Sequence, residues 1–141
     1  MGLFTYHNHS KRHNGVVKVL ARAARQALNA KVDEEDMAHQ VYSPDARPDI
    51  RIQQRSRRYK LLEVKCLCPL SSNPALLDLD GSFAAFANTA PPKRAEVAAK
   101  YAPAKIKGHD VIPCVFEVFG GAAPEVMRLI ETWSRAARTT A

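Results

Sequence analysis

The chain has 141 residues, 46% hydrophobic and 25% charged, a composition typical of one globular domain with its own hydrophobic core. Its formal net charge of +7 and pI near 9.6 predict a polyanionic partner and exclude neither nucleic acid nor an anionic membrane surface. No apolar run is long enough to cross a bilayer and no secretory leader is visible, so we expect an intracellular protein, cytoplasmic or nuclear, with no membrane partner.

The first predicted element is an amphipathic helix that follows a polar, histidine-rich segment at 1–14. Gly15 opens GVVKVLARAARQALNA, whose apolar residues recur at helical spacing. Its outer face is basic, without a polybasic tail elsewhere in the chain, which favours nucleic acid over a membrane. We expect a single domain over 15–138. The candidate nucleic-acid contacts on and beside this helix are Lys18, Arg22, Arg25 and His13.

Three strands are predicted after this helix. The acidic stretch at 33–36 is typical of a turn, with Asp33 as a possible helix cap, and 37–43 predicts a short strand. DIRI and YKLLEVKCLC predict two further strands. The polar QQRSRR stretch joins them over a short distance, so we expect antiparallel neighbours.

The second half of the chain predicts a helix, a strand and a last helix. PKRAEVAAKYA, from Pro92, indicates a helix that ends before Pro103, and the residues at 111–119 indicate a buried strand. Pro124 opens a last helix that runs towards Arg138. Its predicted buried residues are Val126, Ile130 and Trp133. The whole order, helix-strand-strand-strand-helix-strand-helix, predicts an α/β domain with a small central mixed sheet flanked by helices.

The strand LLEVKCLC carries two charges on one face. Because side chains alternate across a strand, Glu63 and Lys65 share a face, while Val64 lies on the other, uniformly apolar face. The same alternation separates Asp49 from the core-facing Ile50 in DIRI. Burying an unpaired charge is unfavourable, so these charges indicate a purpose. A hairpin would bring the carboxylates of Asp49 and Glu63 close together.

Two adjacent carboxylates repel each other, and a divalent cation relieves that repulsion. Mg²⁺ or Mn²⁺ suits two such oxygen ligands together with waters and a substrate phosphate. Lys65 is then placed to orient the attacking water or to stabilise the developing charge. We expect the basic loop to lie beside this site and to grip a nucleic-acid backbone. Its residues are Arg55, Arg57, Arg58 and Lys60. The alternative is a plain Glu63–Lys65 ion pair with Asp49 in a turn.

Pro48–Asp49 followed by Glu63-Val64-Lys65 resembles the PD-(D/E)xK nuclease superfamily, whose core order is helix, three strands, helix, strand. More narrowly, RHNGVVKVLARAARQAL, RPDIRI, LLEVKCLCP, AEVAAKYA and VIPCVFEVFGG are similar to the restriction-like endonuclease domains of retroelement reverse transcriptases. The similarity covers residues 13 to about 135. It implies a restriction-endonuclease-like fold in which Asp49, Glu63 and the Val64 backbone carbonyl hold the metal and Lys65 assists the water.

Members of that superfamily often carry a further acid upstream of the aspartate. The first predicted helix has none, which leaves Glu34 and Glu35 as secondary candidates, with a solvated turn as the alternative role. Zinc is a second metal to consider, since histidine and cysteine are its usual ligands. The residues concerned are His7, His9, His13, Cys66, Cys68 and Cys114. Their spacing matches no known finger, and cysteines in buried strands act as small hydrophobes, so we favour Mg²⁺ or Mn²⁺ over zinc.

The sequence therefore predicts a metal-dependent endonuclease that hydrolyses phosphodiester bonds through a metal-activated water, with DNA favoured over RNA. The first alternative is a nucleic-acid-binding module that keeps the nuclease fold and has lost the chemistry. The second is a small structural or assembly protein. The short chain predicts that any targeting comes from a homodimer or from a separate protein.

Overall fold

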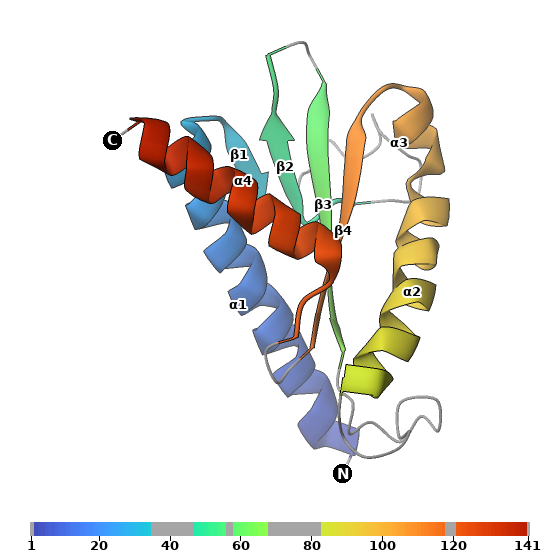
Figure 1. Ribbon diagram of the computed structural model, residues 1–141. Coiled ribbons are helices and arrows are strands. Elements are labelled where there is room, and N and C mark those ends of the chain that lie inside the picture. The colour runs from blue at the N-terminus through green and yellow to red at the C-terminus, as the bar shows by residue number, and fades with distance from the viewer. Residues whose placement is uncertain (1, 35–46, 56–57, 68–82, 118–120, 141) are drawn as a thin grey trace.

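The computed structural model describes residues 2–34, 47–55, 58–67, 83–117 and 121–140, with side chains described for 11–34, 47–55, 58–66, 92–116 and 121–139. Helices and strands follow one another in an α/β order (Figure 1). They are α1 (Gly2–Leu28), β1 (Val32–Glu34), β2 (Ile50–Gln53), β3 (Tyr59–Leu67), α2 (Phe83–Lys100), α3 (Ala102–Ile106), β4 (Asp110–Glu117) and α4 (Pro124–Thr140).

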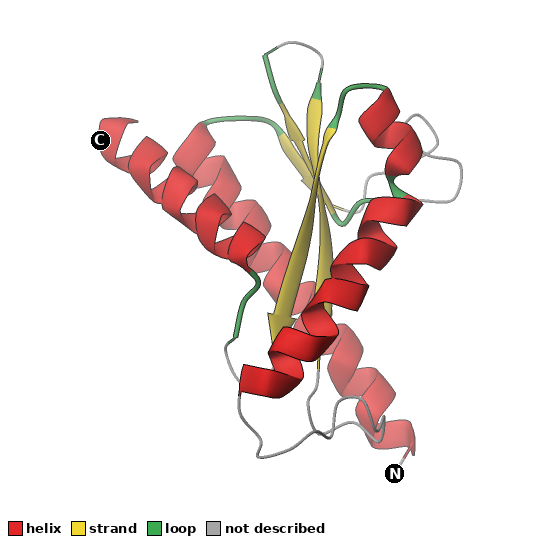
Figure 2. Cartoon of the chain, turned by 45° about the vertical axis from the view of Figure 1, so that its right-hand side comes forward, coloured by secondary structure: helices red, strands yellow, loops and turns green. Residues whose placement is uncertain are grey.

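The four strands form one mixed sheet in the order β1-β2-β3-β4. β2 pairs antiparallel with both β1 and β3, and β4 pairs parallel with β3. α1 and α4 pack on one face of the sheet, and α2 and α3 pack on the other (Figures 1 and 2). The predicted α/β class, the central mixed sheet with flanking helices and the antiparallel DIRI hairpin are confirmed.

Each face of the sheet has its own hydrophobic core. On the α1 and α4 side, small residues such as Ala21 and Ala24 let α1 approach the sheet, and Leu62 and Val64 of β3 are fully buried beneath it. On the other side, Leu61 packs against α2 and α3 in a smaller cluster. The alternation predicted for β3 is therefore confirmed, with the charged positions on the α2 side.

The beginning of the chain differs from the prediction. α1 starts at Gly2, so the segment at 2–14 continues the helix, and Gly15 lies inside it. Its polar residues carry no core-facing periodicity, but extending an existing helix adds one hydrogen bond per residue without a new nucleation cost. A Cβ at Gly15 would meet no atom within 4 Å, so packing does not require glycine there.

The predicted turn at 33–36 is wrong for its first residues, because Asp33 and Glu34 belong to β1. Asp33 caps no helix there; it lies opposite Arg51 and forms an ion pair with it. A strand of three residues is too short to show alternation in the sequence. The strand predicted at 37–43 lies outside the described residues.

The bounds of α2 and the buried residues of α4 also differ from the prediction. α2 begins at Phe83, before the prolines that favoured a start at Pro92, and it ends at Lys100. The short helix α3 was not predicted: Pro103 does not end the helical segment but lies in the first turn of α3, where a missing N–H loses no helical hydrogen bond. In α4 the predicted core residue Ile130 is 43% exposed, whereas its neighbour Leu129 is 4% exposed and packs in the core. Adjacent helix residues differ by about 100° around the axis, so one wrong position on the apolar stripe exchanges a buried side chain for an exposed one.

Candidate functional site

Asp49 and Glu63 occupy facing positions on neighbouring strands. The β2–β3 register pairs Ile50 with Leu62, and one further step along both chains sets Asp49 opposite Glu63. Directly opposed residues of an antiparallel pair have their side chains on the same face of the sheet. Asp49 lies just before the first residue of β2, so the two carboxyl groups meet where the paired hairpin ends.

The carboxylate of Asp49 replaces a backbone acceptor at the end of the ladder. The Val64 N–H donates to Asp49 Oδ2 over 2.7 Å. Continued pairing would set Val64 against Pro48, which has no N–H to donate in return. In a strand the N–H and the carbonyl of one residue point to the same side, so the Val64 carbonyl points towards Asp49.

His13 reaches the site from α1. It lies on the same helical stripe as the core residues Val17 and Ala24, but one turn earlier, beyond the end of β2. Its Nε2 atom is 3.2 Å from Asp49 Oδ2, and both side chains are largely covered. The structure therefore places His13 against a carboxylate of the site, whereas the sequence predicted a contact with nucleic acid.

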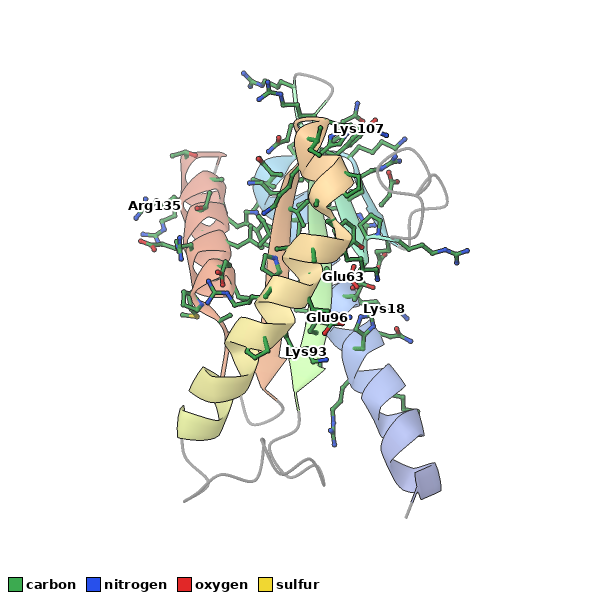
Figure 3. All side chains as sticks on the ribbon, turned by 90° about the vertical axis from the view of Figure 1, so that its right-hand side faces the viewer. Lys18, Glu63, Lys93, Glu96, Lys107 and Arg135 are labelled. Carbon is green, nitrogen blue, oxygen red and sulfur yellow. The ribbon has the colours of Figure 1, made fainter. Side chains whose placement is uncertain are left out.

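Glu63 is a buried charge with three partners. Its side chain sits beside the C-terminal part of α2 (Figure 3), where the Tyr101 hydroxyl donates to Oε2. The ammonium groups of Lys65 and Lys100 lie 3.8 and 3.9 Å from Oε1. Burial is the main cause that raises the pKa of Glu63, and the nearby charge of Asp49 raises it further; Tyr101 and the two lysines act in the opposite direction.

Tyr101 and Lys100 were not among the residues predicted from the sequence. A signal for Tyr101 was present, because Val97, Tyr101 and Ala104 recur at helical spacing and form the buried stripe of this segment. A buried tyrosine hydroxyl requires a hydrogen-bond partner. Burial and the charge of Glu63 raise the pKa of Tyr101, which keeps the hydroxyl protonated as a donor. Nothing in the sequence pattern connects Lys100 to Glu63 before the fold is known.

The oxygen atoms of Asp49, Glu63 and the Val64 carbonyl fit a hard divalent cation. The contacts of Asp49 described above involve Oδ2, which leaves Oδ1 for coordination, and the lysines lie too far from Glu63 Oε1 for hydrogen bonds. With the Val64 carbonyl, these are oxygen ligands of the kind that Mg²⁺ and Mn²⁺ prefer. Within the described side chains, no three histidines, cysteines or acids gather into a group that could hold a metal. Water and substrate would complete the coordination.

The sequence predicted that the basic hairpin loop lies beside these carboxylates, and for its described residues this prediction is wrong. Arg58 directly precedes β3, so at about 3.3 Å per residue it lies about 16 Å along the strand from Glu63. Arg55 is exposed near the same tip. Lys60 pairs with Ile52, so its side chain is on the α1 face, away from Glu63. Arg57 lies outside the described residues.

The predicted basic residues of α1 divide into two groups. Lys18 and Arg22 are exposed on the outer side of the helix. Arg25 donates to the Val32 carbonyl over 2.9 Å and pairs with Glu34 at 3.3 Å, so it ties α1 to β1.

The secondary acidic candidates do not join the site in the described residues. Glu34 pairs with the core residue Ile50 in the sheet register, which puts its side chain on the α1 face, opposite to Glu63. It is therefore a strand residue and not part of a solvated turn. Glu35 lies outside the described residues.

The zinc candidates are dispersed where they are described. Cys114 is fully buried, and burial raises the pKa of its thiol to about 12. Cys66 packs against the core on the α1 side. His13 contacts Asp49, as described above. The side chains of His7, His9 and Cys68 lie outside the described set.

Comparison with known families, with curated proteins and with solved structures found no match for the chain. Among the described residues, no helix is both long enough and apolar enough to span a membrane. What the side chains around Asp49 and Glu63 can do chemically is therefore inferred from their own geometry.

Proposed function

We propose that the chain is a metal-dependent endonuclease with a restriction-endonuclease-like fold. It hydrolyses phosphodiester bonds of nucleic acid, with DNA favoured over RNA as the substrate. The observation that carries the proposal is the facing pair Asp49 and Glu63 at the end of the β2–β3 ladder. Lys65, on the same face of β3, supplies a positive charge 3.8 Å from Glu63. A carboxyl whose pKa is raised first by burial and then by a second carboxyl is typical of functional sites.

Each residue of the site has its own role in the proposed reaction. Asp49, Glu63 and the Val64 carbonyl would hold Mg²⁺ or Mn²⁺, which when bound polarises the scissile phosphate and lowers the pKa of a water molecule. The Val64 N–H fixes the Asp49 carboxylate, and the Tyr101 hydroxyl fixes that of Glu63. The Lys65 ammonium group stabilises the negative charge that develops on the phosphate in the transition state.

Substrate attraction comes from the basic surface. The chain has 21 lysines and arginines against 14 acids, and Lys18 and Arg22 on α1 are exposed. Such side chains bind phosphates without reading the base sequence, so they support a nucleic-acid substrate and carry no preference for a particular site.

A non-catalytic nucleic-acid-binding module is the second candidate, and one observation favours it. Asp49 and Glu63 already have partners inside the chain, Asp49 in Val64 and His13, Glu63 in Tyr101. Carboxylates satisfied in this way also occur as structural groups. In such a module, removal of either carboxylate would leave the affinity for nucleic acid unchanged, with or without a divalent cation.

The two candidates separate in a cleavage assay. The full chain is incubated with end-labelled single-stranded, duplex and branched DNA and RNA, in Mn²⁺ or in EDTA. We expect cleavage only with the metal, and a loss of about 100-fold or more in rate for Asp49→Ala, Glu63→Ala and Lys65→Ala.

Glu131→Gln is the matched control, because Glu131 is an exposed acid of α4, on the other face of the sheet, that pairs with Arg135. Its cleavage rate should equal that of the wild type, and circular dichroism should show that all variants keep the fold. Cleavage undiminished in the Asp49 and Glu63 variants would exclude the proposed site. Salt-dependent binding without cleavage would favour the binding module.

A further inference from the structure

Lys60 is a charged residue on a face of the sheet that is otherwise apolar. It pairs with the core residue Ile52 across the β2–β3 ladder and precedes Leu62 by two residues, so its side chain is on the face that α1 and α4 cover (Figure 1). The residue is half-buried. Among the described residues, no acid pairs with its ammonium group. Burying part of an unpaired charge is unfavourable, so Lys60 indicates an anion that comes from outside the chain.

A hollow of about 780 Å³ lies on one side of Lys60, between the end of α1 and the hairpin end of β2. We call it the tip hollow. Its volume is in the range of about 300–1,000 Å³ that is usual for ligand sites. Its cations are Lys31, Arg55 and Lys60, of which the first two are exposed, and no acid is among the described residues that line it.

A second hollow, of about 240 Å³, lies on the other side of Lys60, between β4 and the first half of α4. We call it the α4 hollow. Lys60 and the exposed Arg128 are its cations. Glu125 is the only acid among the described residues that line either hollow, and its carboxylate pairs with Arg94 of α2. The charge of Glu125 is therefore balanced inside the chain, which leaves the two cations of the α4 hollow for a ligand.

The two hollows adjoin at Lys60, and together they present four cations. Lysine and arginine side chains bind phosphate groups, and the chain as a whole carries a net charge of +7. Because the cations are divided between two hollows, a ligand that meets all of them needs several negative groups in a row. A hollowed surface also fits a strand better than it fits a flat membrane. The phosphate backbone of a nucleic acid has both properties.

We propose that Lys60 and the two hollows beside it bind the phosphate backbone of a nucleic acid. The site lies on the opposite face of the sheet from Glu63 and requires neither Asp49 nor Glu63, so it goes beyond the proposed nuclease function. It holds a different segment of nucleic acid from the one at the carboxylates, because the sheet separates the two places. Its contacts are with phosphates, so it does not distinguish base sequences.

The first test measures binding of a fluorescent single-stranded 20-nucleotide DNA as a function of salt, in EDTA, so that no metal-dependent reaction contributes. Lys60→Gln removes the cation that the hollows share, and Lys60→Gln/Arg128→Gln removes one more. Each phosphate contact on a single strand contributes about 0.7 to the slope of log K against log salt, so the two variants should lose about 0.7 and about 1.4. Lys60→Arg keeps the charge and should keep the slope.

Arg138→Gln is the matched control. It removes an exposed cation of α4 that lies ten residues beyond Arg128, about 15 Å along the helix, and its slope should equal that of the wild type. The competing role for Lys60 is to stabilise the negative end of α1, whose last residue Leu28 also lines the tip hollow. In that role Lys60→Gln lowers the Tm and keeps the slope of the wild type, and this result would overturn the inference.

Two further probes test the class of ligand. Inorganic pyrophosphate carries phosphate groups on a small anion, and phosphatidylserine vesicles carry them on a membrane surface. We expect both to bind more weakly than the DNA. If either binds the wild type as tightly as the DNA does, with the same dependence on Lys60 and Arg128, the assignment to nucleic acid is overturned.

A cleavage assay on the same proteins separates this site from the proposed nuclease. A wild type that cleaves nothing, together with a slope that falls in Lys60→Gln, would refute the nuclease function and support the site. Metal-dependent cleavage, together with an unchanged slope in Lys60→Gln and in the double variant, would refute the site and leave the nuclease function standing.

Discussion

Tyr101, at the junction of α2 and α3, donates its hydroxyl hydrogen bond to the buried carboxyl group of Glu63 in the middle of β3. Both side chains are almost fully enclosed. The bond connects the helix layer on this face to the strand that carries the candidate site, so the position of Glu63 depends on the packing of α2. Without this bond, the described charge partners of buried Glu63 would be the ammonium groups of Lys65 and Lys100, 3.8 and 3.9 Å from its Oε1 atom and beyond hydrogen-bond distance.

Replacement of Tyr101 by phenylalanine removes this donor and leaves the shape of the side chain unchanged. We expect a loss of about 1–3 kcal/mol in the free energy of unfolding at neutral pH, because Glu63 keeps its burial and loses its hydrogen bond. The change also raises the pKa of Glu63 further, since Tyr101 holds it down. Urea denaturation followed by circular dichroism measures the loss.

The Glu63→Leu background provides the control for Tyr101. Without a carboxylate to receive the bond, removal of the hydroxyl should change stability much less, and the double-mutant cycle gives the coupling between the two residues. Equal losses in the two backgrounds would mean that the hydroxyl stabilises the fold through another contact.

The pH dependence of stability provides a second prediction. In the folded chain the pKa of Glu63 lies above its ordinary value of 4.5, mainly through burial. The folded state therefore binds this proton more tightly than the unfolded state, and the stability it contributes below pH 4.5 is lost as the pH rises through the raised pKa.

Glu63→Gln has no such proton and keeps an oxygen for Tyr101. Without divalent metal, the Tm of the variant minus that of the wild type should therefore be more positive at pH 8 than at pH 4. Thermal melts at the two pH values measure this difference. A difference that does not change with pH, or that has the opposite sign, would contradict the assignment of a raised pKa to Glu63.

Gly108 provides a third prediction, on the turn between α3 and β4. Its φ of 91° is unfavourable for any residue with a Cβ, so Gly108→Ala should cost about 1–2 kcal/mol in unfolding free energy. Among the described residues, the added methyl group would meet Arg58 alone, at an ordinary contact distance, so the cost is conformational and not steric. Gly15→Ala, within α1 and with no neighbours, should instead leave stability equal or raise it by about 1 kcal/mol.

Alternation along β3 made half of the site predictable. The two-residue period separates Glu63 and Lys65 from Leu62 and Val64, and the short hairpin connection requires antiparallel pairing with Asp49 nearby. These features are local in the sequence. The partners of Glu63 on α2 are not, because they depend on how a helix far along the chain packs on the sheet.

The basic loop shows why the distance between the loop arginines and the carboxylates was predicted wrongly. The sequence places Arg58 near Glu63 in number, but β3 is extended, so each intervening residue adds about 3.3 Å. Asp49 precedes β2 and therefore lies at the end of the β2–β3 hairpin that is opposite to the loop, whereas Arg58 lies at the loop itself. Similarly, β1 has only three residues, and the polar first half of α1 has no apolar stripe for a pattern to reveal.

The central claim is that Asp49 and Glu63 share one divalent cation, and titration calorimetry with Mn²⁺ tests it most directly. The wild type and Glu131→Gln should bind one Mn²⁺ with the same heat, and Asp49→Asn and Glu63→Gln should each lose that heat while they keep the fold. Equal heats in all four proteins, or no heat in the wild type, would contradict the account.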